Sequence, residues 1–215
     1  MFSVQPYSQY RDKFMFYTVP FSSTVTESVR LGEDVISSDA FINSIHTQCP
    51  EIDFSFVLKK AVPNFESRSW SYYDHFFVQM KSNGDATVVT HEFSHSFGRL
   101  KDEYYEETEG AAGNAGEPNC LPTEDEARRV WGPLVGVEEA ERLIAQARVW
   151  NAAPSDSGDP GCGGICDSRC NSYFRPRFNS IMRHNGAKTF GGEPGGDTFN
   201  DVSRVWLENK LKAIA

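Results

Sequence analysis

The chain mixes strand-like hydrophobic runs with stretches of helical spacing. Runs rich in β-branched and aromatic residues predict strands, here over residues 13–19, 52–62 and 75–80. Apolar positions that recur every three or four residues predict helices, here over residues 38–48, 86–97 and 200–214, with two short helices within 123–149 interrupted at Gly132 and Pro133. Strands that alternate with helices favour a twisted, mostly parallel sheet backing the helix at 86–97.

Length and composition indicate one folded unit. The chain has 215 residues, of which 39% are hydrophobic, and this is enough to build one core, so we expect a single domain over residues 1–215. In the last predicted helix, Val202, Val205, Trp206 and Leu211 share one face that should point inward. No run approaches 18 apolar residues, so the sequence predicts no membrane insertion.

The charge balance narrows the class of partner. The net charge is −9 and the isoelectric point is near 5.1, with no cluster of Lys or Arg. Both nucleic acid and anionic membrane surfaces attract proteins through clustered positive charge. Neither is therefore an expected partner.

The most informative motif is His91-Glu92-Phe93-Ser94-His95, within the helix predicted at 86–97. Residues four apart on a helix face the same way, so both imidazoles can bind one zinc ion. Glu92 then lies beside the metal, where it can move a proton between a water molecule and a leaving amine. The alternative is an exposed helix whose histidines have no function.

The residues after the motif supply a candidate third ligand. At Gly98 the helix can end with a positive φ and the chain can turn back. Asp102 and Glu103 follow, and the carboxylate of either one can reach the metal. Three protein ligands with one open position are typical of catalytic zinc, whereas structural zinc usually has four.

Two segments together resemble the M64 family of IgA-peptidase-like metallopeptidases. The first covers residues 90–104, Thr-His-Glu-Phe-Ser-His-Ser-Phe-Gly-Arg-Leu-Lys-Asp-Glu-Tyr, and the second covers residues 173–185, with Ser-Ile-Met-Arg at its centre. The resemblance implies Asp102 rather than Glu103 as third ligand. A metzincin would place this ligand at position 101, which is Lys101 here.

The resemblance also carries expectations about fold, location and two further residues. It implies an α+β, metzincin-like layout, with Met182 in a turn beneath the zinc and a loop-rich C-terminal part that ends in a helix. Residues 2–19 resemble the strand that opens such domains. The family is typically exported, so we expect an extracellular or cell-envelope (periplasmic) enzyme. Family members usually carry a leader and often an extra N-terminal domain, and this chain begins where the catalytic part would, so the N-terminal part of a longer precursor is expected to be missing.

His184 follows Met182 by two residues, where several metzincin families place a Tyr that donates a hydrogen bond to the transition-state oxyanion. His184 would then be a catalytic residue, and the alternative is a surface histidine. Tyr104 either orients the metal ligand, donates to substrate or packs against the helix. His46 and His75 are expected to be structural.

The five cysteines bear on whether the protein folds in an oxidising compartment. Cys162, Cys166 and Cys170 lie close together in a Gly-rich stretch, whereas Cys49 and Cys120 stand apart. Disulfides are favoured over a second metal site, because structural zinc motifs prefer paired Cys-x-x-Cys sets. A bridge from the cluster to Cys120 would tie the long segment 106–160 to the Met182 region. Asp156 and Asp159 are interpreted as a solvated acidic turn rather than a Ca²⁺ site.

Together these features predict a zinc-dependent endopeptidase that acts on protein or peptide substrates. Its zinc would be held by His91, His95 and Asp102, with Glu92 as general base. Substrate preference and oligomeric state are not encoded in these motifs. Two alternatives belong to other classes: a zinc-binding but inactive recognition or adhesion module, which has no chemical need for Glu92, and a metallohydrolase that does not cleave peptides.

Overall fold

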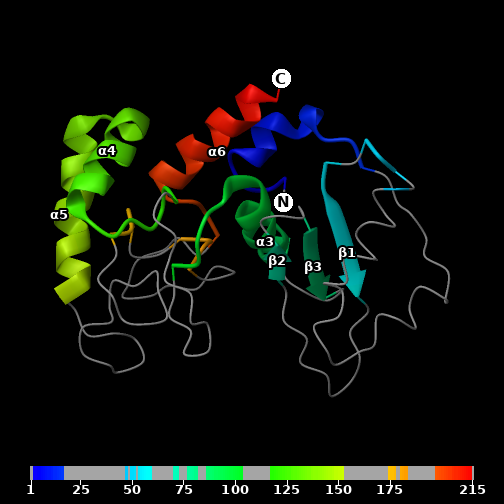
Figure 1. Cartoon of the computed structure of the whole chain (residues 1–215), viewed down its shortest axis with the longest axis horizontal. Helices are drawn as coiled ribbons and strands as arrows, with labels where there is room; N and C mark the ends of the chain where they lie inside the picture. The colour runs from blue at the N-terminus through cyan, green and yellow to red at the C-terminus, as the bar shows by residue number, and fades with distance from the viewer. Residues whose placement is uncertain are drawn as a thin grey trace, which may run out of the picture.

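The computed structural model describes residues 2–16, 47, 49–51, 53–59, 70–72, 77–81, 86–103, 117–152, 174–177, 180–183 and 197–214. Within them, a small sheet lies at one end of the molecule and a pair of helices at the other, with two helices between (Figure 1). The elements are η1 (Tyr7–Lys13), β1 (Ser55–Lys59), β2 (Trp70–Tyr72), β3 (Phe77–Lys81), α3 (Ala86–Gly98), α4 (Glu124–Val135), α5 (Val137–Ala152) and α6 (Asp201–Ala213).

The sheet has the order β1-β3-β2. β1 pairs with β3 in parallel and β2 pairs with β3 antiparallel. Only four residues separate β2 from β3, and a parallel crossover needs a dozen or more, so this pair must be antiparallel. α3 packs on β2 and β3.

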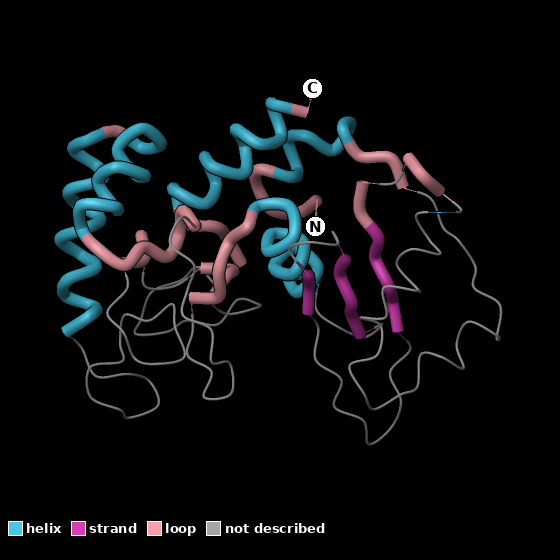
Figure 2. The backbone as a smooth tube through the Cα atoms, in the orientation of Figure 1, coloured by secondary structure: helices cyan, strands magenta, loops and turns pink. Residues whose placement is uncertain are grey.

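The predicted fold class is therefore wrong. We expected an α+β, metzincin-like layout built on a twisted, mostly parallel sheet, but the described residues are mainly helical and their sheet is small and mixed (Figure 2). The hydrophobic pattern marks strands but does not give their direction. It also missed β2, a strand of three residues.

The strand predicted over residues 13–19 is also wrong in its described part, residues 13–16. Lys13 ends the 3₁₀ helix η1, and Phe14 is extended but pairs with none of the strands that the structure describes. Instead, the rings of Phe14 and Phe16 pack against Phe2, at centroid distances of 5.2 and 5.5 Å. The aromatic alternation that predicted a strand therefore serves ring packing.

The other predicted helices and strands agree with the structure in part. The helix expected at 86–97 is confirmed as α3, and the strands expected at 52–62 and 75–80 contain or overlap β1 and β3. Of the helix expected at 38–48, only Thr47 is both described and helical. The two helices expected within 123–149 are α4 and α5. The break expected at Gly132 and Pro133 is wrong, because α4 continues through both residues to Val135, and its C-cap is Gly136, whose φ is +92°.

The terminal helix is confirmed as α6, with Asn200 as its N-cap accepting a hydrogen bond from the Ser203 backbone N–H. Val202 and Leu211 are buried as expected, whereas Val205 and Trp206 are only half-buried. The expectation missed Leu207, which is fully buried against α3.

Two hydrophobic clusters hold these elements together. The first joins η1, α3, α6 and the 180–183 segment, and its buried members are Val4, Tyr7, Phe93, Leu100, Ile181, Met182, Phe199, Leu207 and Leu211. The second joins α4 and α5 to the start of α6, with Trp131 fully buried at its centre. α3 thus lies between the sheet and α6, with both faces covered.

No described helix has the length and apolar character that crossing a membrane requires.

Candidate metal centre

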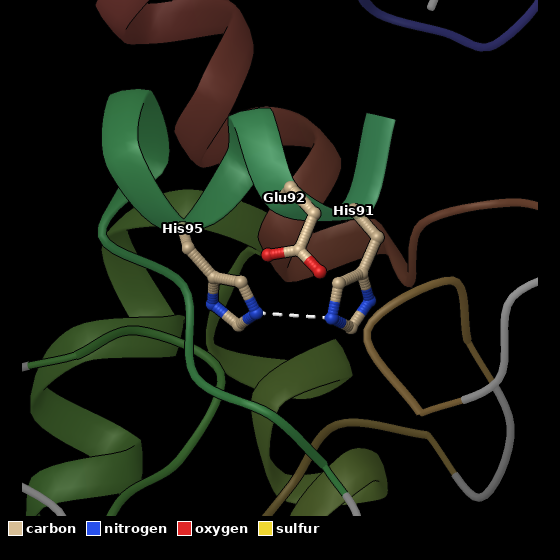
Figure 3. Close-up of side chains that lie close together, drawn as sticks. All are labelled: His91, Glu92 and His95. Carbon is tan, nitrogen blue, oxygen red and sulfur yellow. Dashed lines mark hydrogen bonds between the residues drawn. The ribbon is translucent and has the colours of Figure 1, made fainter. Parts of the chain in front are cut away.

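Both histidines of the motif lie on the buried face of α3. His91 is 2% exposed and His95 is 7% exposed, so the exposed-helix alternative does not hold. Their Nε2 atoms lie 3.0 Å apart, and the carboxylate of Glu92 lies between the two rings (Figure 3). Ligand atoms of His91, Glu92 and His95 lie within 4.8 Å of one another, and these three buried residues could hold a metal ion.

The end of α3 brings Asp102 to the same point. Its Oδ1 lies 2.9 Å from His91 Nε2 and 3.1 Å from His95 Nε2. Three ligands of a tetrahedral zinc are about 3.3–3.4 Å apart when each is about 2.0–2.1 Å from the metal. The observed triangle is slightly smaller than this, and a small movement outward would accommodate a cation.

Hydrogen bonds at the far side of each ring fix which nitrogen faces Asp102. His91 Nδ1 donates to the Ile181 carbonyl at 2.8 Å, and His95 Nδ1 donates to the Leu100 carbonyl at 2.6 Å. A carbonyl only accepts, so Nδ1 carries the proton and Nε2 of a neutral ring presents a lone pair. Ligand histidines in metal sites are oriented in the same way.

Asp102 Oδ1 completes this convergence. It is buried, and it can accept a hydrogen bond from either histidine only when that ring carries a proton on Nε2. A buried carboxylate oxygen normally accepts a hydrogen bond, and leaving it unsatisfied is costly. Three electron-pair donors facing one point require a positive charge there, either a proton or a metal ion.

The pKa shifts of His95 and Asp102 also indicate that this site favours a positive charge. Burial by itself lowers the pKa of His95, but the charge of Asp102, a hydrogen bond to it and the charge of Glu92 outweigh burial and raise the pKa to about 9. Burial raises the pKa of Asp102, yet the two histidines lower it well below its usual range. In the absence of metal, a proton on His95 partly compensates the carboxylates.

Glu103, the other candidate for third ligand, points elsewhere. It is fully buried, and its carboxylate accepts hydrogen bonds from Asn119, Ser180 and Asn200. Burial raises its pKa, an effect that the Ser180 and Asn119 hydrogen bonds and the charges of Arg175 and Arg183 oppose. Of the two carboxylates that the sequence left open, Asp102 and not Glu103 thus faces the histidines.

The turn at the end of α3 differs from expectation at Gly98. We expected a positive φ there, but the left-handed residue is Arg99, with φ 54°. Gly98 is favoured for a different reason: a Cβ at this position would lie 2.5 Å from Leu207 Cδ2, so the Leu207 side chain would have to shift. The absence of a side chain lets α6 approach α3, and Trp206 Nε1 donates to the Gly98 carbonyl at 2.7 Å.

Met182 lies in a turn, and its predicted place beneath a zinc ion stays a prediction. It is fully buried in the first hydrophobic cluster, and its carbonyl accepts from the Glu103 backbone N–H at 2.9 Å. Its neighbour Ile181 supplies the carbonyl that orients His91.

Several predicted residues lie outside the described part of the chain. They are His46, His75, Tyr104, Asp156, Asp159, Cys162, Cys166, Cys170 and His184. The oxyanion role of His184 and the participation of the cysteine cluster in a disulfide therefore stay predictions. Cys120 is disulfide-bonded and Cys49 has a free thiol.

Sequence reasoning missed the residues that hold Glu103 beside Asp102. Asn119, Arg175 and Ser180 are buried and bonded to Glu103. Ser180 stands in the Ser-Ile-Met-Arg stretch and Asn200 at a helix start, so each carried a weak signal. Asn119 carried none.

No family model and no curated protein matches the chain.

Proposed function

We propose that this protein is a zinc-dependent endopeptidase of the M64 type, in which His91, His95 and Asp102 bind the metal and Glu92 is the general base. The observation that carries the proposal is the convergence of two buried Nε2 atoms and Asp102 Oδ1 within 3.1 Å, beside the buried carboxylate of Glu92. The resemblance of residues 90–104 and 173–185 to the M64 motifs supports it.

The donor set favours zinc. Two imidazole nitrogens and one carboxylate oxygen are ligands that catalytic zinc takes, whereas Ca²⁺ and Mg²⁺ prefer oxygen ligands alone. Three ligands would leave a fourth position for water or substrate. When bound there, zinc supplies a Lewis acid and lowers the pKa of water in contact with it to about 7.

Glu92 would carry the proton. Its carboxylate lies between the two imidazoles on the inner face of α3 (Figure 3), so it can accept a proton from the attacking water and pass it to the departing amine nitrogen. Its burial, at 5% exposed, excludes bulk water that would compete for this proton. The substrates would be proteins or peptides, and we place the enzyme in an extracellular or cell-envelope compartment, consistent with the disulfide of Cys120.

Cleavage of a peptide library, with and without a chelator, tests the proposal. Glu92→Gln should keep zinc, measured by elemental analysis, but should slow hydrolysis by about 10²-fold or more, because an amide cannot accept the proton. His91→Ala is the matched contrast, since it should lose both zinc and activity.

Each other outcome would point elsewhere. A wild-type protein that binds zinc and cleaves no peptide would favour the inactive recognition module. A fully active Glu92→Gln variant would assign the proton transfer to another group. Absence of any transition metal from protein prepared without chelators would remove the proposed centre itself.

A further inference from the structure

Glu103 is fully buried and every polar group it has is hydrogen-bonded. Its bonds reach three separate parts of the chain, and we refer to Glu103 with Asn119, Arg175, Ser180 and Asn200 as the Glu103 hub. The bonds are Asn119 Nδ2 and Asn200 Nδ2 to Oε1, both at 3.0 Å, Ser180 Oγ to Oε2 at 2.7 Å, Arg175 Nη1 to the carbonyl at 2.7 Å, and the backbone N–H to the Met182 carbonyl at 2.9 Å.

The hub fixes the main chain on both sides of Asp102. Glu103 follows Asp102 directly, so its buried side chain and bonded backbone set the direction of the Asp102 peptide. On the other side, the Asn119 side chain accepts from the Lys101 N–H at 2.9 Å and donates to the Lys101 carbonyl at 2.8 Å. Asp102 thus faces the histidines from a backbone that hydrogen bonds hold at both Lys101 and Glu103.

The hub also reaches His91. Ser180 Oγ donates to Glu103 and accepts from the Met182 backbone N–H at 3.1 Å, which closes the turn around Ile181. The carbonyl of Ile181 is the acceptor for His91 Nδ1. A chain of hydrogen bonds therefore runs from Glu103 through Ser180 to the ring of His91. The acceptor for His95 Nδ1 is the Leu100 carbonyl, whose peptide group is held through its Lys101 N–H by Asn119 and not by Ser180.

We propose that Glu103 is a positioning residue of the metal centre, which holds Asp102 through the backbone and His91 through the turn at residues 180–182. The proposal rests on the metal ligands of the proposed function and not on peptide hydrolysis. Partners that orient metal ligands typically contribute 10- to 100-fold to metal affinity.

Four variants test it. Glu103→Ala removes the hub, and Ser180→Ala removes only its link to the turn. Glu103→Gln is the conservative variant, because its amide oxygen can accept from both asparagines and its nitrogen can donate to Ser180. Thr123→Ala removes the side-chain cap of α4, which accepts from the Glu126 N–H, and perturbs the fold away from the hub.

Two measurements that need no peptidase activity give the answer. Chelator competition should show zinc affinity about 10- to 100-fold weaker in Glu103→Ala, largely restored in Glu103→Gln and unchanged in Thr123→Ala. NMR of the metal-free protein should show the Nδ1–H signal of His91 shifted in Ser180→Ala while the His95 signal keeps its position.

The proposal is overturned if folded Glu103→Ala and Ser180→Ala proteins bind zinc as the wild type does and leave the His91 signal in place. If Glu103→Ala does not fold, Ser180→Ala alone decides. A wild type that binds zinc but cleaves nothing would end the endopeptidase proposal and leave this one standing. A wild type that binds no metal would overturn both.

Discussion

The carbonyl of Ile181 accepts a hydrogen bond from His91 Nδ1 at 2.8 Å across 90 positions of sequence. The equivalent acceptor for His95, the Leu100 carbonyl, is five residues away. His95 is therefore oriented by the turn that ends its own helix, and His91 by a distant segment. Both Nε2 atoms face Asp102 only when the long-range contact has formed.

Asp102→Ala should weaken zinc binding by more than about 100-fold, since even the residues that merely support ligands contribute about 10- to 100-fold. The loss should exceed that in Glu103→Ala, because Asp102 Oδ1 lies within 3.1 Å of both Nε2 atoms. Chelator competition on the two variants side by side makes the comparison. Equal losses, or a larger one for Glu103→Ala, would argue against Asp102 as ligand.

Metal and proton should compete for His95. With the metal-free pKa raised to about 9, His95 is protonated at pH 7.5, so metal binding must displace that proton. Apparent zinc affinity should rise about tenfold per pH unit from pH 7 toward pH 9 and then level off. Calorimetry in buffers of different ionisation enthalpy measures the proton release, and a flat affinity over this range would contradict the shift.

The raised pKa of His95 also determines whether the folded state gains or loses stability as the pH rises. A histidine whose folded pKa exceeds its unfolded value near 6.5 stabilises the folded state below pH 6.5 and loses this contribution as pH rises through about 9. Metal-free protein should therefore become less stable to denaturant between pH 6.5 and 9. His95→Gln should lose this slope.

Glu117 should cause a second fall in folding stability with rising pH, over a lower pH range than His95. Burial raises its pKa to about 7, against the opposing charges of Lys101, His95 and Arg99, and its Oε2 has no hydrogen-bond partner. The folded state therefore holds this proton more tightly, and stability should fall as pH rises from about 4.5 to 7, by at most about 3 kcal/mol.

Glu117→Gln should flatten that slope in the metal-free protein and raise its stability at neutral pH. Denaturant unfolding at pH 5 and pH 7.5 measures the change, and Glu138→Gln, at an exposed position on α5, is the control. Identical pH dependence in wild type and Glu117→Gln would show that the carboxyl is solvated.

Gly98→Ala should destabilise the fold by about 1–3 kcal/mol, the usual cost of overpacking. Elsewhere in a helix this substitution gains up to about 1 kcal/mol, but here the new Cβ would lie 2.5 Å from Leu207 Cδ2. On a Leu207→Ala background the cost should largely vanish, and a double-mutant cycle by denaturant unfolding measures the coupling. A coupling energy near zero would place the steric conflict elsewhere.

The sequence determined what depends on neighbours along the chain. The spacing of His91 and His95 places both rings on one helix face because helical hydrogen bonds join residues four apart, and the bounds of α3 and α6 followed from the same periodicity. The acidic residues after Gly98 marked where a third ligand could come from.

Only the tertiary structure decided which of two adjacent carboxylates faces the histidines. Asp102 and Glu103 point in different directions because Glu103 is drawn into a buried set of donors from Asn119, Ser180 and Asn200. The contact of Gly98 with α6 likewise depends on how the chain returns. Such partners are set by the path of the intervening chain and by packing, which no local spacing encodes.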